Sequence, residues 1–127
     1  MGSAVLDTSA VLALIKNEDG AEAARAAVRG AFVSIVNHAE ILSRLMRAGM
    51  SLEAVRLACR RAGYVPAPFS TEQAEECARL VRWTHHLGLS LADRACLALA
   101  KLGRHEVLTA DRAWTKLQIG VPIRAIR

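Results

Sequence analysis

Hydrophobic residues along this chain follow two patterns, short apolar runs and longer stretches with helical spacing. The short runs predict strands, and the run that contains two prolines suits a strand at the edge of a sheet. The stretches between them place apolar residues on one face of a helix. Strands are expected at 4–6, 32–36, 63–69, 106–109 and 121–126, and helices at 8–16, 21–29, 37–48, 51–61, 71–86, 90–102 and 112–117.

Short apolar strands that alternate with helices are typical of a parallel sheet that is buried on both faces. The pattern therefore predicts an α/β fold with three layers, in which helices cover both sides of a sheet. No linker, repeat or low-complexity stretch interrupts the alternation. A chain of 127 residues is expected to form a single domain, here over residues 1–127.

Polar residues mark the expected starts of the helices. Thr8 or Ser9 is expected to cap the helix after the first strand, and Asn37 the helix after the second. Ser90 precedes a helix that is apolar almost all round, which is typical of a central helix. Trp114, in the last short helix, is expected to belong to the core.

Composition adds two constraints to this picture. The hydrophobic fraction is 53% and the aromatic fraction only 4%, so the core is expected to consist mainly of small aliphatic side chains. Neither an export signal nor a membrane-spanning run is expected, because no apolar stretch approaches the roughly 20 residues that a span needs. Cys59, Cys77 and Cys96 lack the spacing of a zinc site and are expected to be buried, reduced thiols of a cytoplasmic protein.

The chain carries a net charge of +5, with 17 basic and 12 acidic residues. Most of the positive charge comes from arginine, whose guanidinium group binds phosphate oxygens in a bidentate way. The charge is compatible with a polyanionic partner such as a nucleic acid. Many basic proteins simply have solvated surfaces, so the charge permits this partner without identifying it.

Two aspartates follow predicted strands directly. Asp7 comes after the run 4–6, and Asp111 lies just beyond the run that ends at Thr109. In open α/β sheets, ligands bind in the crevice beyond the carboxyl ends of the strands. A buried carboxylate there needs a cation or a hydrogen-bond donor. Each aspartate also has a purely structural interpretation, as a cap of the helix that follows it.

Two further acids lie near predicted helix starts. Glu40 is three residues after Asn37 and Asp93 is three residues after Ser90, and both spacings match a capping box. Glu40 has a second structural interpretation, as an i,i+4 ion-pair partner of Arg44. For Asp93 the apolar character of its helix favours a position in a dry crevice.

The four acids are more informative together than singly. A parallel sheet gathers its strand ends and the following helix starts at one edge, so Asp7, Glu40, Asp93 and Asp111 are expected to meet there. Crowded carboxylates repel one another unless they hold protons or bind cations. Ligation by oxygen alone suits Mg²⁺, or Mn²⁺, better than zinc.

The segments around these acids resemble PIN-domain nucleases, and specifically the VapC-type toxins of bacterial and archaeal toxin–antitoxin pairs. One such segment is a weak signal, but four in the expected order along nearly the whole chain are specific. The matching segments are 5–10, 34–42, 89–93 and 108–114.

This resemblance implies a parallel five-stranded sheet and a cytoplasmic endoribonuclease that cuts RNA. It also implies a homodimer and a small antitoxin of the VapB type whose tail enters the acidic groove. By the resemblance, Asp7 and Asp93 are the principal metal ligands, whereas Glu40 and Asp111 complete the metal site and position water. Some relatives carry a further acid shortly after the fourth aspartate, but this chain does not, which puts a second tightly held metal in doubt.

Several neighbours of the acids are candidates for supporting roles. Thr109 matches a hydroxyl position beside the acids in the PIN-type toxins, and Thr8 or Ser9 is expected to act similarly. Some arginines close to the acids are expected either to contact phosphates of the substrate or carboxylates of the antitoxin, or to form structural ion pairs. These arginines are Arg44, Arg47, Arg94 and Arg112.

The mechanism expected from these residues is Mg²⁺-assisted hydrolysis of a phosphodiester bond in RNA, with Glu40 orienting or deprotonating the attacking water. A phosphatase of the haloacid-dehalogenase kind would need a second aspartate at position 9, which is a serine. A phospho-receiver domain would need paired acids at the first strand and a lysine near the last strand, and neither is found. The remaining alternative is a PIN-like module that binds RNA or protein without catalysis.

Overall fold

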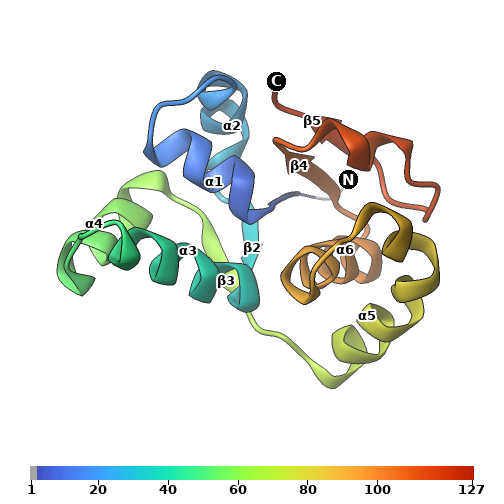
Figure 1. Cartoon of the computed structure of the whole chain (residues 1–127). Coiled ribbons are helices and arrows are strands. Elements are labelled where there is room, and N and C mark those ends of the chain that lie inside the picture. The colour runs from blue at the N-terminus through green and yellow to red at the C-terminus, as the bar shows by residue number, and fades with distance from the viewer. Residues whose placement is uncertain (1–2) are drawn as a thin grey trace.

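A computed structural model describes residues 3–127 as a five-stranded parallel sheet with helices on both faces (Figure 1). The strand order is β3-β2-β1-β4-β5, and each neighbouring pair is parallel. The prediction of a three-layer α/β/α fold with five parallel strands is confirmed. The strands are β1 (Ala4–Leu6), β2 (Phe32–Ser34), β3 (Val65–Ala67), β4 (Glu106–Thr109) and β5 (Ile123–Ala125).

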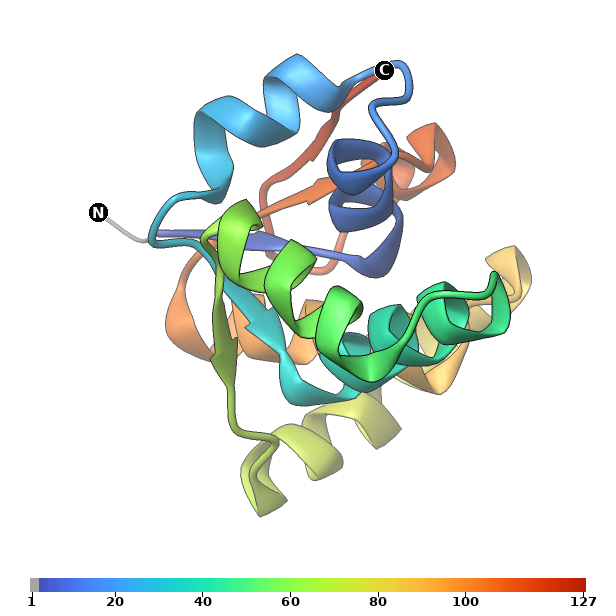
Figure 2. The same ribbon diagram turned by 90° about the vertical axis from the view of Figure 1, so that its left-hand side faces the viewer.

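The helices form two layers, with α1 and α2 on one side of the sheet and α5 and α6 on the other (Figure 2). The helix α4 lies in the first layer, and α3 contacts both α1 and α6. The helices are α1 (Thr8–Ile15), α2 (Ala21–Val28), α3 (Ile35–Arg47), α4 (Leu52–Ala62), α5 (Thr71–Thr84) and α6 (Leu91–Gly103), with the short 3-10 helices η1 (His85–Leu87) and η2 (Arg112–Lys116).

Alternation along the strands divides the core into two parts. Leu6 and Leu108 belong to the cluster under α1, α2 and α4, whereas Val5 and Val107 belong to the cluster under α5 and α6. This follows from the geometry of a strand, in which successive side chains point to opposite faces. The helix α6 is buried along Ala95–Ala100, which confirms the prediction that it is central.

The strand β3 lies at an edge of the sheet, as the prolines of the run 63–69 predict. Pro66 is aligned with Val33 of β2. Among residues 3–127, β2 is the only strand that pairs with β3. Proline has no N–H group, so in an interior strand it would remove a hydrogen bond of the ladder. At this edge the loss is avoided.

Two predicted helix starts are wrong. The helix α3 begins at Ile35, and its cap is Ser34, whose Oγ accepts a hydrogen bond from the Val36 N–H at 3.3 Å. Asn37 therefore lies inside the helix, and β2 ends two residues earlier than expected. The cap of α1 is Asp7, not Thr8 or Ser9.

The last predicted strand, 121–126, is also shortened, because β5 begins only at Ile123. The three cysteines are buried and unpaired, as predicted, and Trp114 lies in the core with 2% of its surface exposed. Among residues 3–127, no helix combines the length and the hydropathy needed to cross a bilayer.

Candidate active site

The four acids line a single cavity at the carboxyl ends of the strands. Asp7 follows β1 and Asp111 follows β4, and these two strands are neighbours in the sheet. Glu40 comes from α3 and Asp93 from the first turn of α6. The cavity has a volume of about 310 Å³ and is lined by Asp7, Thr8, Ser9, Glu40, Arg44, Ser90, Asp93, Asp111 and Trp114.

Asp7 is the most buried of the four acids, with 3% of its surface exposed. Burial raises its pKa to about 6, and the negative charge of Asp93 adds to this rise. Hydrogen bonds from Thr109, Ser9 and the Ala10 N–H lower the pKa in part. At neutral pH the carboxylate is therefore ionised at an energetic cost, which a bound cation would offset.

Hydroxyl groups hold the Asp7 carboxylate in one orientation. Ser9 Oγ donates to Oδ1 at 2.7 Å, and Thr109 Oγ1 donates to Oδ2 at 2.6 Å. Each hydroxyl also accepts a backbone hydrogen bond, Ser9 from Ala110 and Thr109 from Asp111. The predicted supporting hydroxyls thus connect the end of β1 to the end of β4.

Three of the acids also take part in capping helices, which confirms the structural interpretation of each. Asp7 Oδ1 accepts from the Ala10 N–H at 2.8 Å, and Asp111 Oδ1 accepts from the Ala113 N–H at 3.0 Å. Asp93 forms the predicted capping box with Ser90. A cap uses only part of the hydrogen-bonding capacity of a carboxylate, which has about four lone-pair sites. The caps therefore orient the acids without saturating them.

Glu40 forms no capping box, because Asn37 is not the cap of α3. Its Oε1 accepts from Thr8 Oγ1 at 2.5 Å, and its Oε2 lies 3.4 Å from the Arg44 guanidinium. The Thr8 hydroxyl in turn accepts from Asn37 Nδ2 at 3.1 Å. The predicted ion pair between Glu40 and Arg44 is present, but its distance is long. Asn37 was not predicted as a neighbour of the site. Its place three residues before Glu40, on the same face of the helix, was the available signal.

The predicted arginines lie in different surroundings. Arg44 lines the acidic cavity, and together with Arg47 it also lines a shallower hollow next to it. Arg94 donates to the carbonyl of Cys77, and Arg112 donates to the carbonyl of Arg127. Arg44 is therefore the arginine that the structure brings to the acids.

The acidic cavity fits a hard divalent cation in its donor chemistry. Asp93 is close enough for its charge to raise the pKa of Asp7, and both residues line the same cavity. Within residues 3–127, no three His, Cys, Asp or Glu side chains are already grouped as a metal site. Mg²⁺ commonly binds through one or two carboxylates and keeps several waters, so a closed cage of protein ligands is not required.

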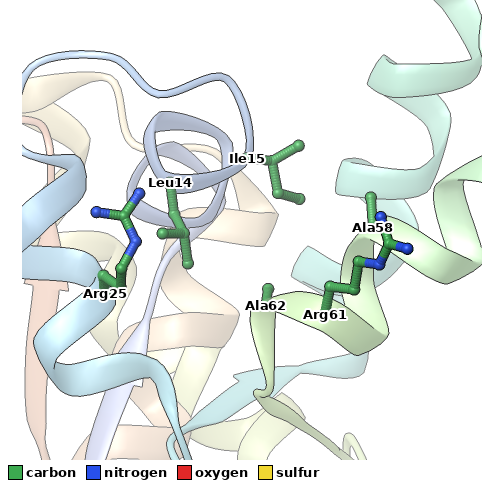
Figure 3. Close-up of a pocket in the computed structure, with 6 residues that line it drawn as sticks. All are labelled: Leu14, Ile15, Arg25, Ala58, Arg61 and Ala62. Atoms are coloured by element: carbon green, nitrogen blue, oxygen red, sulfur yellow. The ribbon is translucent and has the colours of Figure 1, made fainter.

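A second cavity of similar size lies between α1, α2 and α4 (Figure 3). Its volume is about 320 Å³. Arg25 and Arg61 stand on opposite sides of it, and the remaining lining is aliphatic. With two cationic side chains and no carboxylate in its lining, this cavity offers no ligand to a metal ion. The aliphatic residues are Leu14, Ile15, Ala58 and Ala62.

Fold and site together define a parallel α/β domain with an acid-lined cavity at the strand ends. The family model of the PIN domain matches residues 4–119. The chain therefore belongs to the PIN domain family, which confirms the resemblance found in the sequence. A search of curated protein sequences gave no match.

Solved structures of toxin–antitoxin proteins share this fold. The toxin–antitoxin complex from Klebsiella pneumoniae has a chain that is 24% identical, with a TM-score of 0.74 and 98% of each chain covered. The DNA-bound VapBC from Salmonella typhimurium is 16% identical, with a TM-score of 0.77 and 100% of each chain covered. VapBC-5 from Mycobacterium tuberculosis is 22% identical, with a TM-score of 0.62, and 100% of this chain and 99% of that chain are covered.

Proposed function

We propose that this chain is a metal-dependent endoribonuclease and the toxin of a VapBC-type toxin–antitoxin pair. The observation that carries the proposal is that four carboxylates, two that follow β1 and β4 and two from α3 and α6, converge on one cavity of a PIN domain. Structural similarity to VapBC proteins supports the toxin role.

Asp7 and Asp93 are the residues that would hold the ion, Mg²⁺ or Mn²⁺, and Asp111, which lines the same cavity, would be a further ligand. When bound, the ion supplies positive charge that neutralises the phosphodiester and makes water more acidic. The protein's own contribution is to hold the ligands in place. Ser9 and Thr109 do this for Asp7, and Ser90 does it for Asp93.

Glu40 is the residue proposed to take a proton from the attacking water. Its Oε1 is held by Thr8, while among residues 3–127 Oε2 has only the long contact with Arg44 and remains the better acceptor for water. In the reaction the water oxygen bonds to phosphorus, one ester P–O bond breaks, and the leaving oxygen takes up a proton. We propose that Arg44, with 54% of its side chain exposed, contacts a phosphate of the RNA.

The decisive experiment measures cleavage of RNA by the purified protein with Mg²⁺ and with EDTA. Asp93→Asn keeps an oxygen for the capping box but removes the charge, and we expect it to lower kcat by about a hundredfold to a thousandfold. Asp19→Asn is the matched control, because Asp19 is an exposed aspartate outside the cavity. EDTA is expected to stop the reaction. Equal rates for Asp93→Asn and the wild type would exclude the mechanism.

The alternative is a PIN-like module that binds RNA or protein without cutting. It is favoured by the observation that, in the described part of the chain, the acids are not already grouped as a three-ligand site. The same experiment separates the two functions. A binding module would retain RNA on a gel with or without EDTA and would yield no fragments.

The toxin role is tested in cells by expressing the chain with and without the neighbouring open reading frame. We expect growth arrest that the neighbour, a VapB-type antitoxin, relieves and that Asp7→Ala abolishes. We also propose that the protein is a cytoplasmic homodimer whose acidic cavity receives the tail of the antitoxin. Growth arrest that persists in Asp7→Ala would contradict an arrest caused by cleavage.

A further inference from the structure

Asn37 is a fully buried amide beside the acidic cavity, and the mechanism above does not use it. It lies in the first turn of α3 with 0% of its surface exposed. Its Nδ2 donates to Thr8 Oγ1, across the contact between α3 and α1, at 3.1 Å. Buried polar side chains are normally retained where each polar atom has a partner, so this amide needs an explanation.

The contact with Asn37 fixes the direction of the Thr8 hydroxyl. An amide nitrogen only donates and an ionised carboxylate only accepts, whereas a hydroxyl has a single proton to give. Thr8 Oγ1 therefore accepts from Asn37 and donates its proton to Glu40 Oε1, 2.5 Å away. The three side chains form a directional chain that ends on the carboxylate at the cavity.

The other half of the amide makes Asn37 costly to keep. Within residues 3–127, no donor reaches Asn37 Oδ1, which is fully shielded from solvent. A buried carbonyl without a donor destabilises a fold. Leucine has nearly the same branched shape and would avoid this cost. The amide is therefore better explained by what its nitrogen does than by its contribution to stability.

We propose that Asn37 is a positioning residue, which holds Glu40 in the acidic cavity through the Thr8 hydroxyl. Among residues 3–127, the only other polar contact of the Glu40 carboxylate is the long one between Oε2 and Arg44, a side chain that is 54% exposed. The short hydrogen bond from Thr8 is thus the main restraint on the carboxylate. The effect on cleavage rests on the proposed nuclease function, whereas the placement of Glu40 does not.

The kinetic test compares Asn37→Leu and Thr8→Val with the wild type. Loss of a residue that orients a member of a metal site typically costs tenfold to a hundredfold in activity. We expect Asn37→Leu to lower kcat by about that factor, with little change in KM for RNA and an unchanged or higher melting temperature. Thr8→Ser, which keeps the hydroxyl, is expected to restore most of the rate lost in Thr8→Val. Asn37→Ala serves as the second variant if leucine prevents folding.

Two controls separate positioning from a general loss of packing. Thr84→Val removes a fully buried hydroxyl that donates to the Leu80 carbonyl in α5, outside the acidic cavity, and it should leave kcat unchanged. In the Thr8→Val background, Asn37→Leu should have no further effect on kcat, because the chain is already broken. Additive effects of the two substitutions would overturn the proposal, and so would a wild-type kcat in folded Asn37→Leu.

Crystal structures of the variants provide the readout that does not depend on cleavage. We expect the Glu40 carboxylate to leave its place in Asn37→Leu and in Thr8→Val and to keep it in Thr84→Val. If the wild type cuts no RNA but Glu40 moves in this way, the proposed function fails and the positioning role stands. If Glu40 stays in place in Asn37→Leu, the positioning role is excluded whatever the activity.

Discussion

Two cavities of nearly equal volume, about 310 and 320 Å³, differ in their lining residues and in their place in the fold. The acidic cavity lies at the carboxyl ends of β1 and β4 and gathers four carboxylates. The cavity between α1, α2 and α4 is aliphatic and carries Arg25 and Arg61. The first is built from strand ends and helix starts, where capping positions favour acids. The second is built from the sides of helices, where the exposed rim favours long cationic side chains.

This contrast shows that net charge is a poor guide to local chemistry. A chain with a charge of +5 has its candidate active site in a hollow lined by four carboxylates. Such a hollow repels the phosphates of RNA until a cation neutralises it. The positive charge of the surface would attract a polyanion, whereas in the proposed function the four acids would act on it. The linings of the two cavities therefore predict different effects of substitution on the free energy of unfolding and on the response to Mg²⁺.

The largest expected effect concerns the stability cost of ionised Asp7. Its folded pKa of about 6 is raised from 3.8, so the folded state binds the proton more tightly than the unfolded state. The stabilisation from this group is complete below pH 3.8 and is lost as the pH rises through about 6. A shift of that size corresponds to about 3 kcal/mol. At pH 8 the free energy of unfolding of Asp7→Asn is therefore expected to be higher than that of the wild type.

Urea unfolding between pH 4 and pH 8 measures this prediction. The difference between Asp7→Asn and the wild type should be near zero at pH 4 and grow through pH 6. The substitution also alters hydrogen bonding, but the new amide nitrogen can donate to Thr109 where the Asp7 carboxylate accepted from it. Asp19→Asn, at an exposed site, should show no such pH dependence. A constant difference across the pH range would contradict the cost assigned to burial.

The architecture could be predicted from sequence, because apolar runs that alternate with helical stretches indicate a parallel sheet and the prolines of the run 63–69 indicate an edge strand. The acids could be found for the same reason, since Asp7 and Asp111 follow strands that the pattern shows plainly. The start of α3 could not be predicted from sequence, because Ile35 and Val36 suit a strand as well as a helix. The burial of Asn37 depends on the packing of α3 against α1, a contact between distant segments that no local pattern contains.

A smaller effect is expected from Mg²⁺ itself. An ion that binds only the folded state stabilises it by RT ln(1 + [Mg²⁺]/Kd), about 1.4 kcal/mol at ten times Kd. The melting temperature of the wild type should therefore rise by a few degrees at pH 7.5, and less at pH 5, where protons compete for Asp7. Asp7→Asn should lose the shift and Asp19→Asn should keep it, at constant ionic strength. An equal shift in all three proteins would place the ion elsewhere.

The smallest effect is expected from the cavity between α1, α2 and α4. Arg25 and Arg61 form no ion pair with any side chain in residues 3–127, so Arg61→Ala removes little beyond a solvated charge. We expect the unfolding free energy to change by no more than about 0.5 kcal/mol, with the Mg²⁺ shift and RNA cleavage within twofold of the wild type. Chemical unfolding, melting curves and single-turnover cleavage measure the three quantities. Removal of a positive charge next to the four acids would alter ion binding there. A loss of the Mg²⁺ shift in Arg61→Ala, which removes a charge from the other cavity, would therefore show that the two cavities are coupled.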